Sequence, residues 1–309
     1  MPIHLDAVWH AVRRLPAPYI AARVLRKLGV QAPWLRRTEF MQATDARTPA
    51  RVVKILIGAM RNASLDPTLL VRGAQNKHVL EIGCGRHIGF AALAALAGAR
   101  GYIGIDPSLE PDTLAHPRIQ RDYIARALAD QATLIRELGA TPKPDVTASD
   151  LLANAALIRG GIADIASPEE PIGLCLSISC LEHIQDFEEA VHTIARLSNP
   201  ETMHVHLVNF SNHLSKANPF VPLYDSPYST FKKKWGPIIN GHRISDLQDA
   251  FTKAGVAMQV LPLDVRADAL PQEIDGYWTA RYSNDELAVR TALVTNLAPI
   301  PSSNAPVRR

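Results

Sequence analysis

A glycine-rich turn between two short apolar segments is the feature that most constrains the fold of this chain. An apolar strand is predicted over 79–82, and it leads into a turn with three glycines, Gly83, Gly85 and Gly89. Glycine lets such a turn tighten and lets the backbone approach a ligand where a Cβ would collide. A helix is predicted over 90–99 and a second strand over 101–105, which ends at Asp106. Because a carboxylate there can accept hydrogen bonds from a ribose diol, the pattern predicts a pocket for an adenosine derivative.

Two details of this motif separate it from the NAD fingerprint. The third glycine comes one residue later than in that fingerprint, and Glu81 stands two residues before the first glycine. In both respects the chain resembles the class I S-adenosylmethionine-dependent methyltransferases. In that family the glutamate ends the first strand beside the glycine turn, which receives the methionine part of the cofactor. An NAD-dependent oxidoreductase is the alternative enzyme class.

The resemblance continues downstream in the expected order. A strand-like apolar run over 174–179 leads into Cys180-Leu181-Glu182-His183. This resembles the Ser-x-x-Leu-Glu-His signature that follows the fourth strand of many small-molecule methyltransferases. A third strand is expected over 158–164, and the family places an acid at its end that hydrogen-bonds the adenine amino group. The resemblance assigns that role to Asp164, with Asp150 as the second choice.

The family resemblance also implies an architecture and a set of cofactor contacts. The expected fold is α/β, a Rossmann-like seven-stranded mixed sheet of order 3-2-1-4-5-7-6 with helices on both faces and an N-terminal helical cap. Its fifth, sixth and seventh strands are predicted over 202–209, 256–261 and 287–297, with the seventh antiparallel. The residues expected to bind S-adenosylmethionine are Glu81, Gly83, Cys84, Gly85, Gly89, Asp106, Pro107, Asp164, Ile165, Ser179, Cys180 and Leu181.

The remaining segments are predicted from proline positions, periodicity and composition. Residues 1–75 form a proline-broken helical cap, and residues 76–297 form the methyltransferase domain, with an insertion over about 107–157. Residues 210–242 are expected to be a substrate-facing lid. Its aromatic and basic residues would hold a sugar or phosphate-bearing acceptor, and they are Phe220, Tyr224, Tyr228, Phe231, Lys232, Lys233, Lys234 and Trp235. The last segment, 298–309, has too little apolar content to pack and is expected to be a disordered tail.

Charge and cysteine content limit the class of partner and the compartment. A net charge of +3 over 309 residues is too small to indicate a nucleic-acid partner. The three cysteines are irregularly spaced, which indicates neither a disulfide framework nor a zinc motif and makes a cytoplasmic protein the expectation. The first 37 residues carry seven basic side chains against one acid, Asp6. Such a stretch is either a solvated helical face or a contact with an anionic membrane, which here would be the inner face.

Polar residues gather around the carboxyl end of the fifth strand, where ligands of open α/β sheets bind. Methyl transfer is an in-line displacement, and a hydroxyl acceptor must also lose a proton. His213 is the first candidate for that base, and His183 is the second. His204 and His206 lie on one face of the strand, with a spacing that would suit metal ligands as well as ordinary packing.

The same stretch resembles a bacterial methyltransferase subgroup associated with glycan or secondary-metabolite pathways. In that subgroup the strand ends in Asp-x-x-Asp-His, whereas this chain has Asn209 and Asn212. Neutral amides bind a hard divalent cation less well than carboxylates, so no metal ligand is assigned. The predicted function is S-adenosylmethionine-dependent O-methylation of a small-molecule or glycan-linked hydroxyl. The two asparagines support a further alternative, a non-catalytic scaffold that only binds the cofactor.

Overall fold

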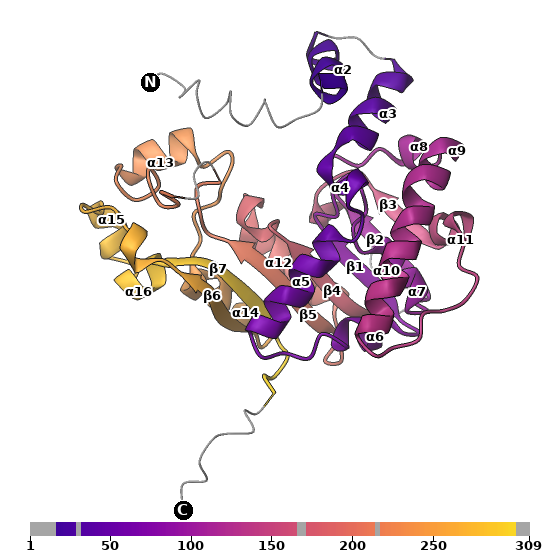
Figure 1. Cartoon of the computed structure of the whole chain (residues 1–309). Helices are drawn as coiled ribbons and strands as arrows, with labels where there is room; N and C mark the ends of the chain where they lie inside the picture. The colour runs from indigo at the N-terminus through magenta and orange to yellow at the C-terminus, as the bar shows by residue number, and fades with distance from the viewer. Residues whose placement is uncertain (1–16, 29–31, 166–170, 214–216, 301–309) are drawn as a thin grey trace, which may run out of the picture.

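A seven-stranded sheet forms the centre of the protein (Figure 1). The computed structural model describes residues 17–28, 32–165, 171–213 and 217–300. The strands are β1 (His78–Ile82), β2 (Gly101–Ile105), β3 (Ala155–Ile158), β4 (Ile172–Ile178), β5 (Met203–Asn209), β6 (Gln259–Val265) and β7 (Val289–Thr295). Their order is β3-β2-β1-β4-β5-β7-β6, and β7 runs antiparallel to both β5 and β6. The predicted topology is therefore confirmed.

Alternation along the strands gives the sheet two apolar faces, each covered by helices. Val79 and Leu80 illustrate the alternation, because they belong to different hydrophobic clusters. One face packs against α5 (Arg51–Asn62), α6 (Leu69–Ala74), α7 (Ala91–Leu96) and α10 (Ala125–Glu137). The other packs against α12 (Phe187–Leu197) and α14 (Ile244–Lys253). Helices on both faces are what buries a parallel sheet, and they leave its carboxyl ends as the place for a ligand.

The described part of the N-terminal segment is helical, as predicted. It contains α2 (Ala17–Lys27), α3 (Pro33–Gln42) and α4 (Thr44–Arg47), followed by α5 and α6. Helix α5 buries Val53, Leu56 and Met60 completely, so the cap and the sheet share one core. On α2 and just after it, Val24 and Leu28 are 49% and 73% exposed. The first sixteen residues lie outside the described ranges, and membrane contact stays a prediction.

In the described ranges, every helix is too short or too polar to cross a lipid bilayer.

The segment between β2 and β3 contains α8 (Pro111–Leu114), α9 (Pro117–Ile119), a π-helical turn (Gln120–Ile124), α10 and α11 (Ala148–Ala153). The helix predicted over 119–139 is thus present, but one of its turns is wound as a π-helix. Such turns are frequent at functional sites, and this one buries Tyr123.

The third strand lies earlier in the chain than predicted. It ends at Ile158, and Asp164 lies in the 3₁₀ turn Ile162–Asp164, where its carboxylate accepts a hydrogen bond from the Gly161 N–H at 2.7 Å. Asp164 is exposed and therefore does not end a strand as expected. Asp150 accepts hydrogen bonds from Thr147 at the start of α11, before β3 begins. This location puts Asp150 at the amino end of the strand, away from the glycine turn.

The aromatic residues of the predicted lid form a third hydrophobic cluster. Phe220, Tyr224 and Phe231 are fully buried against Trp278. The cluster joins α13 (Tyr228–Lys234) to α15 (Gly276–Thr279) and α16 (Asn284–Leu287). The prediction that these three aromatic side chains face a substrate is wrong, because they are more favourably buried against one another. Of the predicted tail, residues 301–309 lie outside the described ranges, and the Ile300 N–H donates to the Ser64 carbonyl.

Candidate active site

The glycine turn after β1 is held against the ends of β2 and β4. The N–H groups of Gly83 and Cys84 both donate to the Ile105 carbonyl, at 2.8 and 3.2 Å. Gly83 and Gly85 have φ values of +72° and +61°, which favour glycine. A Cβ on Gly83 would lie 2.4 Å from the Cys180 Sγ. The turn and the segment after β4 can therefore meet only with glycine at this position.

Glu81 is a buried acid near the end of β1, just before this turn. Its Oε2 accepts hydrogen bonds from the Tyr102 hydroxyl at 2.5 Å and from the Phe90 N–H at 3.0 Å. Burial nevertheless raises the pKa of Glu81 to about 7, because desolvation of the carboxylate outweighs these two bonds. Gly104 leaves room for the Tyr102 ring, since a Cβ on it would lie 2.7 Å from that ring. Tyr102 was not predicted as a site residue, because its only signal in the sequence is the Tyr-x-Gly spacing in the second strand.

Asp106 lies next to the glycine turn, as predicted. Its Oδ2 accepts a hydrogen bond from the Gly85 N–H at 3.0 Å. Its Oδ1 accepts from the Ser108 N–H at 2.6 Å and from the Ser108 hydroxyl at 2.5 Å. The carboxylate thus joins the end of β2 to the turn.

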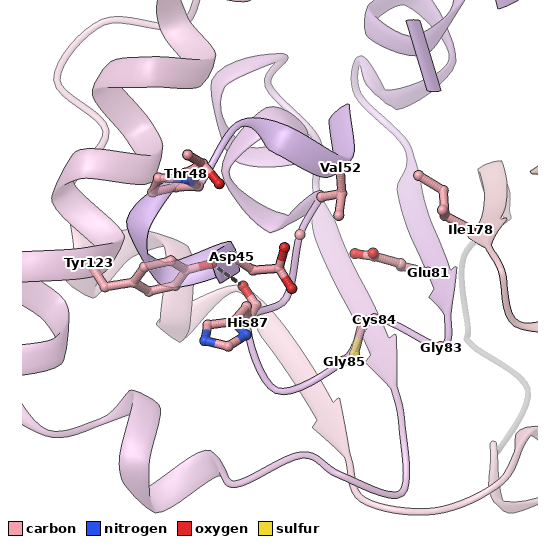
Figure 2. Close-up of a pocket in the computed structure, with 12 residues that line it drawn as sticks. Asp45, Thr48, Val52, Glu81, Gly83, Cys84, Gly85, His87, Tyr123 and Ile178 are labelled. Atoms are coloured by element: carbon pink, nitrogen blue, oxygen red, sulfur yellow. Dashed lines mark hydrogen bonds between the residues drawn. The ribbon is translucent and has the colours of Figure 1, made fainter. Parts of the chain in front are cut away.

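A cavity of about 140 Å³ opens beside the turn (Figure 2). Its lining residues come from the cap, the turn, the π-helical turn and β4: Asp45, Thr48, Pro49, Val52, Glu81, Gly83, Cys84, Gly85, His87, Gly89, Tyr123 and Ile178. Five of the residues expected to bind the cofactor are therefore brought together here. The cap residues and Tyr123 were not predicted, because no local pattern marks them. Pockets for drug-sized ligands have volumes of roughly 300–1,000 Å³, so this cavity has room for only part of such a ligand.

Helix α3 and the π-helical turn hold the cap on the glycine turn. Arg86 forms a 3.0 Å ion pair with Glu39, whose side chain is only 5% exposed. The next residue, His87, hydrogen-bonds the Phe40 carbonyl through Nε2 at 3.1 Å. The Tyr123 hydroxyl donates to the His87 carbonyl at 2.5 Å (Figure 2). The cap is therefore part of the pocket and is bonded to the turn that the pocket needs.

An acid and two histidines meet where β4 and β5 end. Glu182 and His183 lie in the 3₁₀ turn Leu181–His183, and His213 follows β5. Glu182 Oε1 accepts a hydrogen bond from the Asn209 N–H at 3.3 Å and lies 3.7 Å from His213 Nε2. The two imidazole rings lie 5.0 Å apart. The structure thus brings together both histidines predicted to be catalytic, and it adds Glu182 to them.

Burial controls the protonation of this cluster. Desolvation raises the pKa of Glu182 to about 8. Partial burial, followed by the neighbouring His183, lowers the pKa of His213. Both shifts favour the neutral forms of Glu182 and His213 at neutral pH.

Asn240, near the end of the segment 210–242, holds the turn that carries Glu182 and His183. Its amide donates to the carbonyls of Leu181 and Ile184 at 2.8 and 2.9 Å. The Ile238 carbonyl accepts a 2.6 Å hydrogen bond from His183 Nδ1. Since a carbonyl can only accept, Nδ1 carries the proton and Nε2 keeps its lone pair. Sequence analysis gave Asn240 no role, because its partners are distant in the chain.

The asparagines that replace the acids of the subgroup have structural partners. The Asn212 amide donates to the Asn218 carbonyl at 2.7 Å and also to the Val221 carbonyl. A carboxylate at this position could not donate these hydrogen bonds. The Asn209 amide oxygen accepts from the Ser211 N–H at 3.0 Å. These bonds fix the loop after β5, and the two that Asn212 donates require an amide at that position.

His204 and His206 are core residues on the sheet face covered by α12 and α14. Both are buried, and burial lowers the pKa of His204 to about 4. His206 Nδ1 hydrogen-bonds the Ser177 hydroxyl at 3.0 Å. With Cys175 they place three donor atoms within 4.8 Å of one another. This group lies inside the apolar core and not at the carboxyl ends of the strands.

Comparison with known proteins identifies the family. A family model described as a methyltransferase domain matches residues 59–259. This match covers more than half of the chain, so the protein belongs to that family. It confirms the resemblance and decides against the oxidoreductase that the glycine pattern left open. No curated protein matches the chain.

Several solved structures resemble the chain at low identity. An S-adenosylmethionine-dependent methyltransferase from Mesorhizobium loti is 17% identical, with 74% of this chain and 95% of that chain covered at a TM-score of 0.41. PKMT2 from Rickettsia typhi, solved in complex with AdoHcy, is 11% identical, with 78% and 55% covered at a TM-score of 0.40. The YcgJ protein from Bacillus subtilis is 14% identical, with 76% and 94% covered at a TM-score of 0.37.

Substitutions at the contact between Gly89 and Val52 can test how closely the cap packs against the glycine turn. A Cβ on Gly89 would lie 2.3 Å from Val52 Cγ2. We expect Gly89→Ala to lower the free energy of unfolding by about 1–3 kcal/mol, the usual cost of overpacking. Val52→Ala removes the clashing methyl group, so the double variant should recover most of that loss. Urea denaturation of the four proteins measures the coupling, and strictly additive effects would contradict the proposed fit.

Proposed function

We propose that this protein transfers the methyl group of S-adenosylmethionine to a hydroxyl oxygen of a small-molecule or glycan-linked acceptor. The observation that carries this proposal is the position of the cluster Glu182, His183 and His213. It follows the ends of β4 and β5, while the glycine cavity follows the end of the adjacent strand β1. A cofactor seated in the cavity would therefore have polar, proton-handling side chains at the neighbouring strand ends.

The cavity supports a specific orientation for the cofactor. Glu81 Oε1 lies 3.5 Å from the position of a Gly89 Cβ, on the side of the turn that the cavity occupies. A carboxylate there suits the ammonium group of the methionine end. Asp106, at the end of β2, suits the ribose diol, and the methyl group would then point toward the acceptor.

The chemistry assigns separate tasks to cofactor and protein. The sulfonium supplies the methyl group, and its carbon–sulfur bond breaks as the new oxygen–carbon bond forms. The protein aligns the two reacting atoms and activates the acceptor hydroxyl. We assign that activation to His213, with His183 as its neighbour.

The test of this function is transfer of labelled methyl groups from S-adenosylmethionine to separated glycan, lipid and small-metabolite fractions. With an active fraction, His213→Ala should lower turnover by about 10²- to 10⁴-fold, with S-adenosylhomocysteine affinity nearly unchanged. The matched control is His192→Ala, on the exposed face of α12. A loss of less than tenfold would contradict the role of His213. Cofactor binding with no transfer to any fraction would favour the scaffold alternative.

Glu81 predicts a pH dependence of cofactor binding. Its pKa of about 7 means that the carboxyl group is mostly protonated below neutral pH. An ammonium ligand favours the charged form, so affinity for S-adenosylhomocysteine should rise with pH up to about 7 and then level off. Below that pH the slope approaches about tenfold per unit. Calorimetric titration of Glu81→Gln should give weaker binding without this slope, and an equal slope in both proteins would refute the pairing.

The position of Asp106 leads to a prediction about cofactor affinity that can be tested without any methyl acceptor. Asp106→Ala should weaken S-adenosylhomocysteine binding by about 1–3 kcal/mol, because the ribose hydroxyls lose a charged hydrogen-bond acceptor. Asp112→Ala, an exposed acid on α8, is the control. Thermal melting of both variants identifies any loss of folding. Unchanged affinity in a folded Asp106 variant would remove this residue from the binding site.

A further inference from the structure

The acid and the two histidines at the ends of β4 and β5 have the composition of a metal site. One donor atom from each of Glu182, His183 and His213 lies within 4.8 Å of the other two. Three atoms with that spacing can all lie within about 2.8 Å of a common point. Ligand distances to zinc are about 2.0–2.2 Å, so side-chain movements of less than about 1 Å would complete the coordination.

The carboxyl group of Glu182 needs a partner. The side chain is 2% exposed, and its Oε2 has no hydrogen-bond partner among the described residues. Burying an unpartnered carboxyl oxygen is costly, and such atoms in native proteins usually have an explanation. Oε1 is the oxygen that faces His213 Nε2, so a cation held by both carboxyl oxygens would satisfy Oε2 as well.

The rings of the two histidines are placed by different contacts. His213 Nε2 faces Glu182 Oε1 at 3.7 Å. His183 donates through Nδ1 to the Ile238 carbonyl, which leaves the lone pair of Nε2 free. In metal sites the second ring nitrogen almost always donates to a carbonyl or carboxylate in this way.

We propose that Glu182, His183 and His213 bind a divalent transition-metal ion of the zinc class at the acceptor end of the site. Two imidazoles and one carboxylate are a known ligand set of catalytic zinc, which keeps a further position open. Both histidines are partly exposed, so that position faces the solvent side. This inference differs from the expectation, drawn from Asn209 and Asn212, that no metal ligand is present.

The consequence for catalysis rests on the proposed function. The acceptor hydroxyl occupies the open position, where the ion lowers its pKa. The hydroxyl proton goes to solvent, the oxygen bonds to the methyl carbon, and S-adenosylhomocysteine leaves with the electron pair of the carbon–sulfur bond. His213 then activates the hydroxyl as a ligand and not as a free base.

Metal binding can be measured without any acceptor. The full chain is stripped with EDTA and titrated with Co²⁺ by visible absorption and with Zn²⁺ by calorimetry. We expect one ion per chain, and we expect Glu182→Gln, His183→Ala and His213→Ala each to weaken binding by at least about 10-fold. His192→Ala should bind normally. Retained S-adenosylhomocysteine binding shows that each variant is folded.

Two results would overturn the proposal. One is the absence of Co²⁺ and Zn²⁺ binding by the wild-type chain. The other is binding that survives the three substitutions but is lost in His206→Leu, which would place the ion in the buried cluster with Cys175. Methyl transfer by the EDTA-stripped protein would refute the catalytic role of the metal and leave the proposed function intact. Metal binding by a protein that transfers no methyl group to any fraction would refute the proposed function and leave the metal site intact.

Discussion

The buried carboxyl group of Glu81 is the interaction on which the cofactor side of the site depends. It receives the Tyr102 hydroxyl from β2 and the Phe90 N–H just before α7, so one side chain links two strands and a helix. Desolvation keeps its pKa near 7, which means that the pocket is built around a group close to its titration point. A cationic ligand end is the natural complement of such a group, since its charge offsets the cost of ionising the buried acid.

The second constraint is that the cap and the sheet form one packed unit. Helix α5 supplies fully buried residues to the core and places Val52 against Gly89. The ion pair between Arg86 and Glu39 and the bond from His87 to the Phe40 carbonyl fix the same turn from α3. Gly89 is thus required by the cap, because a Cβ there would collide with Val52 of α5.

Much of the sheet and of the glycine turn could be predicted from sequence, because local patterns carry them. Apolar strands, glycine spacing and Glu81 lie within one short stretch, and the topology follows from the family. The third strand was misplaced because Gly160 and Gly161 interrupt it and Asp164 caps the turn that follows. The lid was misinterpreted because composition cannot distinguish aromatic residues that face a ligand from those that bury one another, as Phe231 and Trp278 do.

The contacts that complete the site come from residues far apart in the chain, and those of Asn212 require an amide after β5. Asn212 must donate to two carbonyls to close its loop, and Asn240 donates to two more around Glu182. Those four bonds hold Glu182 and His213 in place without adding charge beside them. Among the described residues, Glu182 supplies the carboxyl donor atom that lies near those of the two imidazoles. The acid chemistry of this cluster therefore falls to a single buried side chain.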